Sequence, residues 1–158
     1  MKSLTHHVFS VGLMLFVLSR FGPTAVVFAP AAVVGAVLTN IVIDEVGHSR
    51  REGALRRSWA THSVLTAPLW GGVVWVLVLL VPALPAGVAL PSVLLVHFAL
   101  LGAVSGSSHL LLDSLTEGGV FGVGFQRRAV AHFQYDNPLL NFGFCALGVL
   151  LAAAAVLY

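Results

Sequence analysis

Apolar residues dominate five stretches of the chain, and four of them are long enough to form a membrane-spanning helix. The stretches cover residues 5–19, 24–43, 59–80, 91–115 and 138–158. A spanning helix needs about 20 mostly apolar residues, so only the first stretch is short. Backbone polar groups in lipid must be hydrogen-bonded within the protein, which favours helices. The pattern predicts an all-α fold: an integral membrane helical bundle of about five transmembrane helices, formed by residues 1–158 as a single domain.

The composition supports a membrane protein. Of the 158 residues, 58% are hydrophobic and 9% are charged, and the mean hydropathy is +0.98. A soluble domain has about 25% charged residues, so this chain has too little charge to cover a soluble surface. The first 22 residues resemble a signal peptide, but no small-residue cleavage site precedes Arg20, so we expect a retained helix. The lone Cys145 excludes a disulfide framework and a cysteine-based metal site.

Small residues predict local features of two helices. In the third stretch, Pro68 and the Gly71–Gly72 pair predict a kink. In the fourth stretch, Gly102, Ser105 and Gly106 form a stripe that suits close helix contact. Association into an oligomer is compatible with this pattern.

The basic residues are distributed unevenly between the two ends of the predicted bundle. Alternating helices place the N-terminus and the polar segments 44–58 and 116–137 on one side. That side has seven of the eight basic residues, and Arg20 alone lies on the other. The positive-inside rule makes the seven-residue side cytoplasmic. We therefore expect an integral protein of the cell (plasma) membrane, with its polar side facing the cytoplasm.

All six acidic residues and every histidine except His97 fall on the same side. Three histidine–aspartate pairs are spaced four apart: Asp44–His48, His109–Asp113 and His132–Asp136. On a helix, such residues share a face, with Cβ atoms about 6 Å apart. The two side chains could bind one metal ion, or the carboxylate could orient the imidazole ring. The structural alternative is a set of solvated helix ends.

Imidazole and carboxylate ligands without thiolate suit a divalent metal, Zn²⁺ first, with Mn²⁺ or Fe²⁺ as alternatives. Asp44 could bridge two ions. His6 and His7 point about 100° apart, so only one of them is expected to be a ligand. His97 lies about 18 Å along the helix from His109, so we expect it to be structural.

The arginine runs allow two compatible interpretations. They set the topology and contact lipid phosphates. Arg57, Arg127 and Arg128 could also bind a phosphate-bearing substrate, because a guanidinium binds phosphate through two parallel hydrogen bonds. Membrane lipid is the expected partner, and no nucleic acid is expected.

The motifs, in their order along the chain, resemble those of a known family. They are "TH-x-x-FS" at residues 5–10, the Asp-to-His element at 44–48, "THS" at 61–63 and "SH-x-x-x-D-x-x-T-x-x-GV" at 108–120. This set resembles the membrane-bound metal-dependent hydrolases known as LexA-binding, inner-membrane-associated hydrolases. The stretches "THHVFSVGL", "IDEVGH" and "THSVLTAPLWG" look closer still to an uncharacterised archaeal branch of small membrane proteins. The resemblance covers most of residues 5–120.

The resemblance implies a ligand set and a chemistry. That family is distantly similar to zinc-dependent phospholipase C and P1-type nucleases, which cleave phosphoesters with clustered zinc ions. The positions that match its motifs are the candidate metal ligands His6, Asp44, His48, His62, His109 and Asp113. The His132–Asp136 pair stays a candidate for additional ligands.

The leading hypothesis is metal-dependent hydrolysis of a phosphoester in a lipid or lipid-linked substrate. Glu117 is the candidate general base, with Glu45 as an alternative, and Asp44 is a candidate catalytic residue as the bridging ligand. Ser63 and Thr116 would orient the ligands. The alternatives are a non-catalytic scaffold with a structural metal, and a transporter for metal ions or protons. The apolar middles of the predicted spans disfavour transport.

Overall fold

The computed structural model describes residues 1–51 and 54–157; for residues 23–24, 48–51 and 54–56 it describes the backbone alone. Five longer helices form the bundle: α1 (Ser3–Ser19), α2 (Ala29–Gly47), α4 (Thr66–Ala83), α5 (Ser92–Ser114) and α6 (Pro138–Leu157). A 3₁₀ helix, η1 (Pro23–Phe28), precedes α2, and the short helix α3 (Trp59–His62) precedes α4. Antiparallel pairs join β1 (His48–Arg51) with β2 (Ala54–Arg57), and β3 (Val120–Phe121) with β4 (Arg127–Arg128).

The helices confirm the expected fold class, an all-α helical membrane bundle. Four helical segments are long and apolar enough to cross a membrane: Ala25–Gly47, Thr66–Ala83, Ser92–Ser114 and Pro138–Leu157. Helix α1 has 17 residues and is therefore about 26 Å long, slightly less than the hydrocarbon core of a bilayer.

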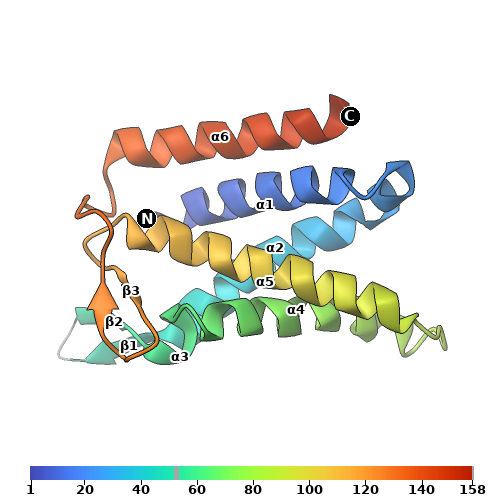
Figure 1. The fold of residues 1–158 in the computed structure, drawn as a ribbon, viewed down its shortest axis with the longest axis horizontal. Helices are drawn as coiled ribbons and strands as arrows, with labels where there is room; N and C mark the ends of the chain where they lie inside the picture. The colour runs from blue at the N-terminus through green and yellow to red at the C-terminus, as the bar shows by residue number, and fades with distance from the viewer. Residues whose placement is uncertain (52–53, 158) are drawn as a thin grey trace.

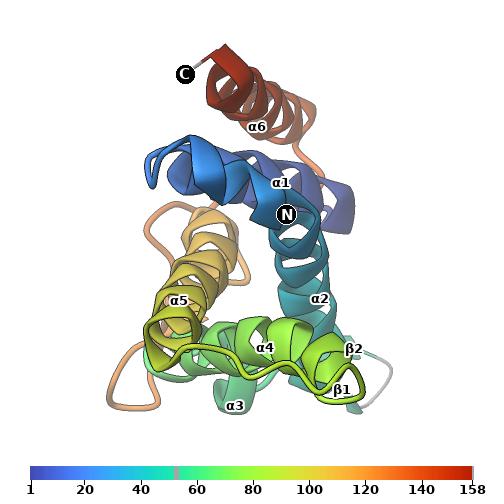
Figure 2. The same ribbon diagram turned by 90° about the vertical axis from the view of Figure 1, so that its right-hand side faces the viewer.

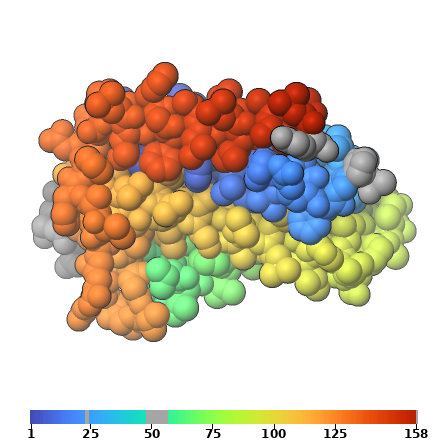
Figure 3. Space-filling model, turned by 45° about the horizontal axis from the view of Figure 1, so that its top comes forward, coloured from blue at the N-terminus to red at the C-terminus, as the bar shows by residue number. Residues whose placement is uncertain are grey.

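The two ends of the bundle differ in content. The N-terminus and both strand pairs gather at one end, and the α1–η1 turn, the α4–α5 connection and the C-terminus lie at the other (Figure 1). In the space-filling view, the orange atoms of segment 116–137 gather at the first end, which we call the polar end (Figure 3). The grouping of the polar segments at one end agrees with the alternation expected from the sequence.

The expected third helix, residues 59–80, divides into α3 and α4. Ser63 has an extended backbone (ψ 148°), forms a parallel bridge with Phe121, and is followed by Val64, whose N–H donates to the Phe121 carbonyl over 3.0 Å. This pairing interrupts the helix between His62 and Thr66. Helix α4 is then continuous through Gly71–Gly72, where we expected a kink. Pro68 is tolerated because it lies in the first turn, where its missing N–H would have no intrahelical partner.

Glycine lets two helix pairs pack backbone against backbone. A Cβ on Gly71 of α4 would overlap the carbonyl of Gly102 of α5, and one on Gly102 would overlap Gly71. The stripe on α5 therefore makes the close contact that the sequence predicted. Gly12 of α1 and Gly148 of α6 meet in the same way. Helix α6 lies on the outside of the bundle beside α1, as the end view shows (Figure 2).

Candidate metal centre

Three histidines and two aspartates meet at the polar end of the bundle. His6 comes from the first turns of α1, Asp44 from the last turn of α2, His62 from α3, and His109 and Asp113 from the end of α5. The three imidazoles and Asp113 are buried, and Asp44 is 25% exposed. Helix α2 continues to Gly47, three residues beyond Asp44, so Asp44 lies inside the helix rather than at its end.

The ligand atoms are spaced as atoms around a metal would be. Asp113 places Oδ1 3.3 Å from His6 Nε2, and Oδ2 3.4 Å from His109 Nε2 and 3.6 Å from His62 Nε2. Asp44 Oδ1 lies 3.4 Å from His109 Nε2 and 3.8 Å from His62 Nε2. Two ligands each about 2.1 Å from a tetrahedral ion are about 3.4 Å apart.

These atoms form two overlapping groups that could each hold a metal ion. His6, His109 and Asp113 form one group, and Asp44, His62 and His109 form the other; within each, the ligand atoms lie within 4.8 Å of one another. His109 belongs to both groups and stacks on His6, with ring centroids 4.2 Å apart. The two groups are therefore contiguous parts of one candidate centre.

Asn40 determines which ring nitrogen of a neutral His109 carries the hydrogen. The Asn40 amide nitrogen donates to the carbonyls of Ala36 (2.9 Å) and His6 (3.4 Å), which leaves its Oδ1 as an acceptor 2.8 Å from His109 Nδ1. His109 Nδ1 must then carry the proton, so a neutral His109 presents a lone pair at Nε2. Such support of the distal ring nitrogen is typical of metal-binding histidines.

The lone pair of His109 faces two carboxylate oxygens. Its Nε2 lies 3.4 Å from oxygens of both Asp44 and Asp113. Within the described part of the chain, His109 Nε2 and Asp113 Oδ2 are buried without a hydrogen-bond partner. Buried polar atoms are normally satisfied, and acceptors that face one another repel unless a proton or a cation lies between them. The geometry therefore favours a bound cation at this point.

The two oxygens of Asp113 have different neighbours. Oδ1 accepts a hydrogen bond from Arg57 Nη2 over 2.6 Å and lies 3.3 Å from the amine of Met1. Arg57 also donates to the carbonyl of Gly119 over 3.0 Å. A Cβ on Gly118 would overlap the Arg57 guanidinium, so this glycine makes room for it. Cationic donors therefore contact Oδ1, whereas Oδ2 faces His62 and His109.

His62 is held by its own neighbours in the sequence and in space. The hydroxyl of Thr61 lies 2.9 Å from His62 Nδ1. A Cβ on Gly47 would overlap both the Thr61 hydroxyl and the His62 ring, so the end of α2 approaches α3 only because residue 47 is glycine. Burial lowers the pKa of His62 below its usual value, which keeps the imidazole neutral and able to bind a metal.

A cavity of about 550 Å³ adjoins the candidate centre. Its lining includes the ligands His6, Asp44 and Asp113, and also Glu45, Arg57, Thr116, Glu117, Gly118 and Arg127. The four carboxylates of this lining outnumber its two guanidinium groups, which favours cations. Glu117, expected as a general base, and two of the expected phosphate-binding arginines therefore face the same space as the ligands.

Several residues singled out from the sequence lie elsewhere. His48 begins β1, one residue after α2 ends, so it does not share a helix face with Asp44, and its side chain lies outside the described residues. His132 and Asp136 are exposed in a non-helical segment and belong to neither metal-binding group of described residues. Because that segment is not helical, their spacing does not give them a common face.

The other candidates divide between supporting and peripheral positions. Thr116 is buried and donates to the backbone carbonyl of Asp113 over 2.9 Å, whereas the Ser63 hydroxyl accepts from Leu65 N–H over 3.2 Å and so supports the turn rather than a ligand. Arg128 is exposed and lies near Gln126. His7 bonds to Ser3 over 3.2 Å, and His97 is exposed at the opposite end.

Asn40 and Thr61 are the functional residues that sequence reasoning missed. Thr61 lies within the "THS" element, and Asn40 stands four residues before Asp44, on the same face of an apolar helix. An amide within an apolar span is a recognisable signal of a buried polar partner. Its partner, His109, is 69 residues away, so the pairing itself has no local signature.

Fold and centre together define a helical membrane protein with clustered candidate metal ligands at one end. The chain belongs to the DUF1286 family, described as a protein of unknown function, whose family model matches residues 1–112. That range contains every described ligand except Asp113, which follows it by one residue. Neither the curated proteins nor the solved structures include a significant match.

Proposed function

We propose that the protein is a metal-dependent membrane hydrolase that cleaves a phosphoester of a lipid or lipid-linked substrate at the cytoplasmic face of the cell membrane. The observation that carries this proposal is the position of His109 Nε2, which is buried against oxygens of Asp44 and Asp113 while Nδ1 faces the Asn40 amide oxygen. Zn²⁺ is the expected ion, and Mn²⁺ or Fe²⁺ would suit the same ligands. When bound, such a metal polarises the phosphoryl group and lowers the pKa of a bound water to about 7.

The chain's own residues supply the remaining chemistry. Arg57 and Arg127 line the cavity and would hold the phosphate, with Arg57 positioned by Asp113 and the Gly119 carbonyl. Glu117 faces the same cavity and would accept a proton from the attacking water. The water oxygen would bond to phosphorus as the ester P–O bond breaks, and the leaving alkoxide would take the proton that Glu117 accepted from the water. Asp44 is part-exposed between His62 and His109, and its carboxylate would be a candidate bridging ligand if two ions were bound.

The resemblance to the LexA-binding, inner-membrane-associated hydrolases supports the proposal independently. Its motifs supply six candidate ligands, one of which is His48, whose side chain lies outside the described residues. The structure brings the other five together from four helices: His6, Asp44, His62, His109 and Asp113. Five ligands exceed the four of a single tetrahedral ion, which suits two ions or an ion with a wider shell.

The packing below the centre favours hydrolysis over transport. Hydrogen-bonded polar side chains continue for about one helical turn, as far as Ser10 and Ser108, whose hydroxyls are 2.9 Å apart. Beyond them Met14, Trp75 and Phe98 fill the bundle as buried apolar residues. A polar pathway would have to pass through this apolar core.

The adjoining cavity favours a catalytic metal over a purely structural one. A structural ion is usually enclosed by four protein ligands, whereas a catalytic ion keeps a position for water. Here His6, Asp44 and Asp113 line a cavity of about 550 Å³ together with Glu117. The ligands therefore border a space large enough for water and a phosphate group.

Metal analysis of protein purified without chelator or polyhistidine tag tests the proposal. We expect at least one equivalent of metal, and metal-dependent hydrolysis of a chromogenic phosphodiester. His109→Ala should lose metal and activity, and Zn²⁺ or Mn²⁺ should restore activity to the wild-type apoprotein. His97→Ala is the matched control, since it makes the same change on the same helix at the opposite end. Equal losses in both variants, or folded wild-type protein that binds no metal, would contradict the proposal.

A further inference from the structure

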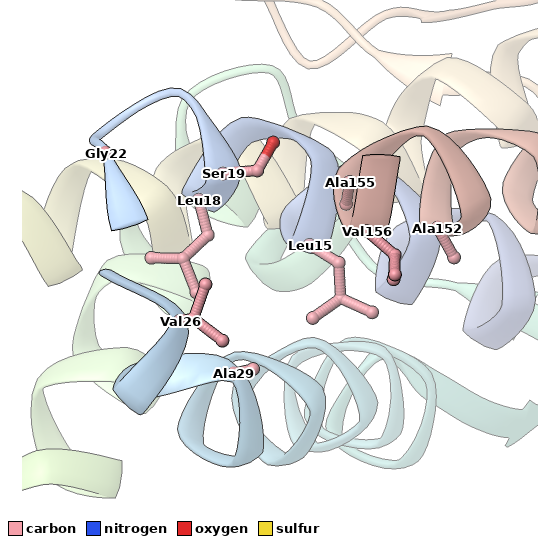
Figure 4. Close-up of a pocket in the computed structure, with 9 residues that line it drawn as sticks. All are labelled: Leu15, Leu18, Ser19, Gly22, Val26, Ala29, Ala152, Ala155 and Val156. Carbon is pink, nitrogen blue, oxygen red and sulfur yellow. The ribbon is translucent and has the colours of Figure 1, made fainter. Parts of the chain in front are cut away.

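Two apolar hollows lie along the seam between α1 and α6, and together we call them the groove. One of about 280 Å³ begins at His7, one of about 350 Å³ lies farther along, and Ala152 lines both. In Figure 4, Leu15 of α1, Val26 of η1 and Ala152 of α6 face the second hollow. From His7 to Ser19 the groove follows α1 for about 18 Å.

Small residues create this groove. The backbones of α1 and α6 lie in contact at Gly12 and Gly148, and neither glycine has a side chain to fill the space beside this contact. Ala152 and Ala155 continue the small-residue face of α6. Nearly all of the lining of both hollows is apolar, as befits a space at the depth of the lipid chains.

The groove starts at the candidate metal centre. Ser3, His7, Val11, Leu15 and Ser19 are spaced by four and therefore lie along one face of α1. Ser3 lines the metal cavity, and its hydroxyl is 3.2 Å from the Nε2 atom of His7, which lines the first hollow. One face of α1 thus extends from the candidate metal ligands and arginines to the apolar groove.

This arrangement matches the chemistry of an amphiphile with one phosphate. We infer that the substrate is an acyl phospholipid, bound with its phosphate in the metal cavity and one acyl chain in the α1–α6 groove. The inference rests on the proposed function and specifies its substrate class. A water-soluble phosphoester would leave the groove unused, whereas each CH₂ of an acyl chain buried there adds binding free energy.

Ala152→Phe tests the groove, because the added ring would fill space at the residue that lines both hollows. Ala153→Phe is the control: it makes the same change one residue on, about 100° around the helix, at an exposed position outside both hollows. The probes are monoacyl glycerol phosphates with a short and a long acyl chain, and a water-soluble phosphodiester. Hydrolysis is measured for all three, and binding of the acyl probes is measured separately by native mass spectrometry.

We expect the wild-type KM to fall with chain length, and Ala152→Phe to raise the KM for the long chain about tenfold, the effect of expelling roughly two CH₂ groups. Ala153→Phe should leave the KM unchanged, and neither variant should alter hydrolysis of the soluble phosphodiester. Equal effects of the two variants, or binding that is independent of chain length, would overturn the inference. If no probe is hydrolysed but chain-dependent binding is lost in Ala152→Phe alone, the result supports acyl-chain binding in the groove and contradicts the proposed hydrolysis.

Discussion

At the scale of single residues, the candidate centre depends on side chains that are not candidate ligands themselves. Asn40 accepts a hydrogen bond from Nδ1 of His109, and the Thr61 hydroxyl lies beside Nδ1 of His62. Arg57 donates a hydrogen bond to one oxygen of Asp113. Each interaction decides which atom of a ligand points inward. In the described part of the centre, the imidazoles all face the aspartates through Nε2.

Asn40→Leu removes the acceptor for His109 while keeping a similar side-chain volume. We expect metal affinity to fall about 10- to 100-fold, the usual cost of losing such a hydrogen bond to a metal-binding histidine. Competition with a chromophoric chelator measures this affinity. Thr39→Val is the control, because Thr39 is equally buried but bonds to Gly35 within its own helix. Unchanged affinity in Asn40→Leu would refute the assigned role of Asn40.

At the scale of elements, glycine contacts determine how the helices pack. The α4–α5 pair meets at Gly71 and Gly102, and the α1–α6 pair at Gly12 and Gly148. The first contact holds α5, which supplies His109 and Asp113, against the bundle. The second attaches α6, which is otherwise tied to the start of α1 by the hydrogen bond from the Thr5 hydroxyl to Asn141.

Gly148→Ala should destabilise the α1–α6 contact, because the new Cβ would overlap the backbone of Val8 and Phe9. Overpacking of this kind costs about 1–3 kcal/mol, which thermal unfolding in detergent can detect. Gly143→Ala is the matched control on the same helix, since its Cβ would meet no atom within 4 Å. A melting temperature for Gly148→Ala that matches the control would show that the helices do not pack this closely in the folded protein.

At the scale of the whole molecule, charge and chemistry are concentrated at one end. The described ligands, the cavity and the strand pairs share the polar end (Figure 1). Seven basic residues also fall in the segments of that end, against Arg20 at the other. By the positive-inside rule, this asymmetry predicts that the polar end faces the cytoplasm.

Reporter fusions after Arg20, Arg57, Ala86 and residue 158 test this orientation. We expect a cytoplasmic signal only for the fusion after Arg57, because the other three positions follow an odd number of crossings. A cytoplasmic signal at Ala86 would contradict the five-helix topology. The arginines of the polar end can also be neutralised while basic residues are added beside Arg20. A reversal of the signals in that variant would show that charge sets the orientation.

The sequence by itself determined the membrane class, the approximate positions of the long helices and the end at which the polar residues gather. These follow from local composition, because span length and charge placement respond to the bilayer rather than to particular neighbours. It also placed His109 and Asp113 on one face, since both lie in a regular helix. The same spacing does not give Asp44 and His48 a common helix face, because α2 ends at Gly47. It does not give one to His132 and Asp136 either, because their segment is not helical.

Only the tertiary structure decided how the helices are rotated and which distant residues meet. The hydrogen bond from His109 to Asn40 and the pairing of Ser63 with Phe121 join segments far apart in the chain. The groove depends on two glycines, Gly12 and Gly148, that meet across different helices. The helices are apolar on most sides, so their patterns do not define a buried face. Close packing of small residues and buried hydrogen bonds select that face instead.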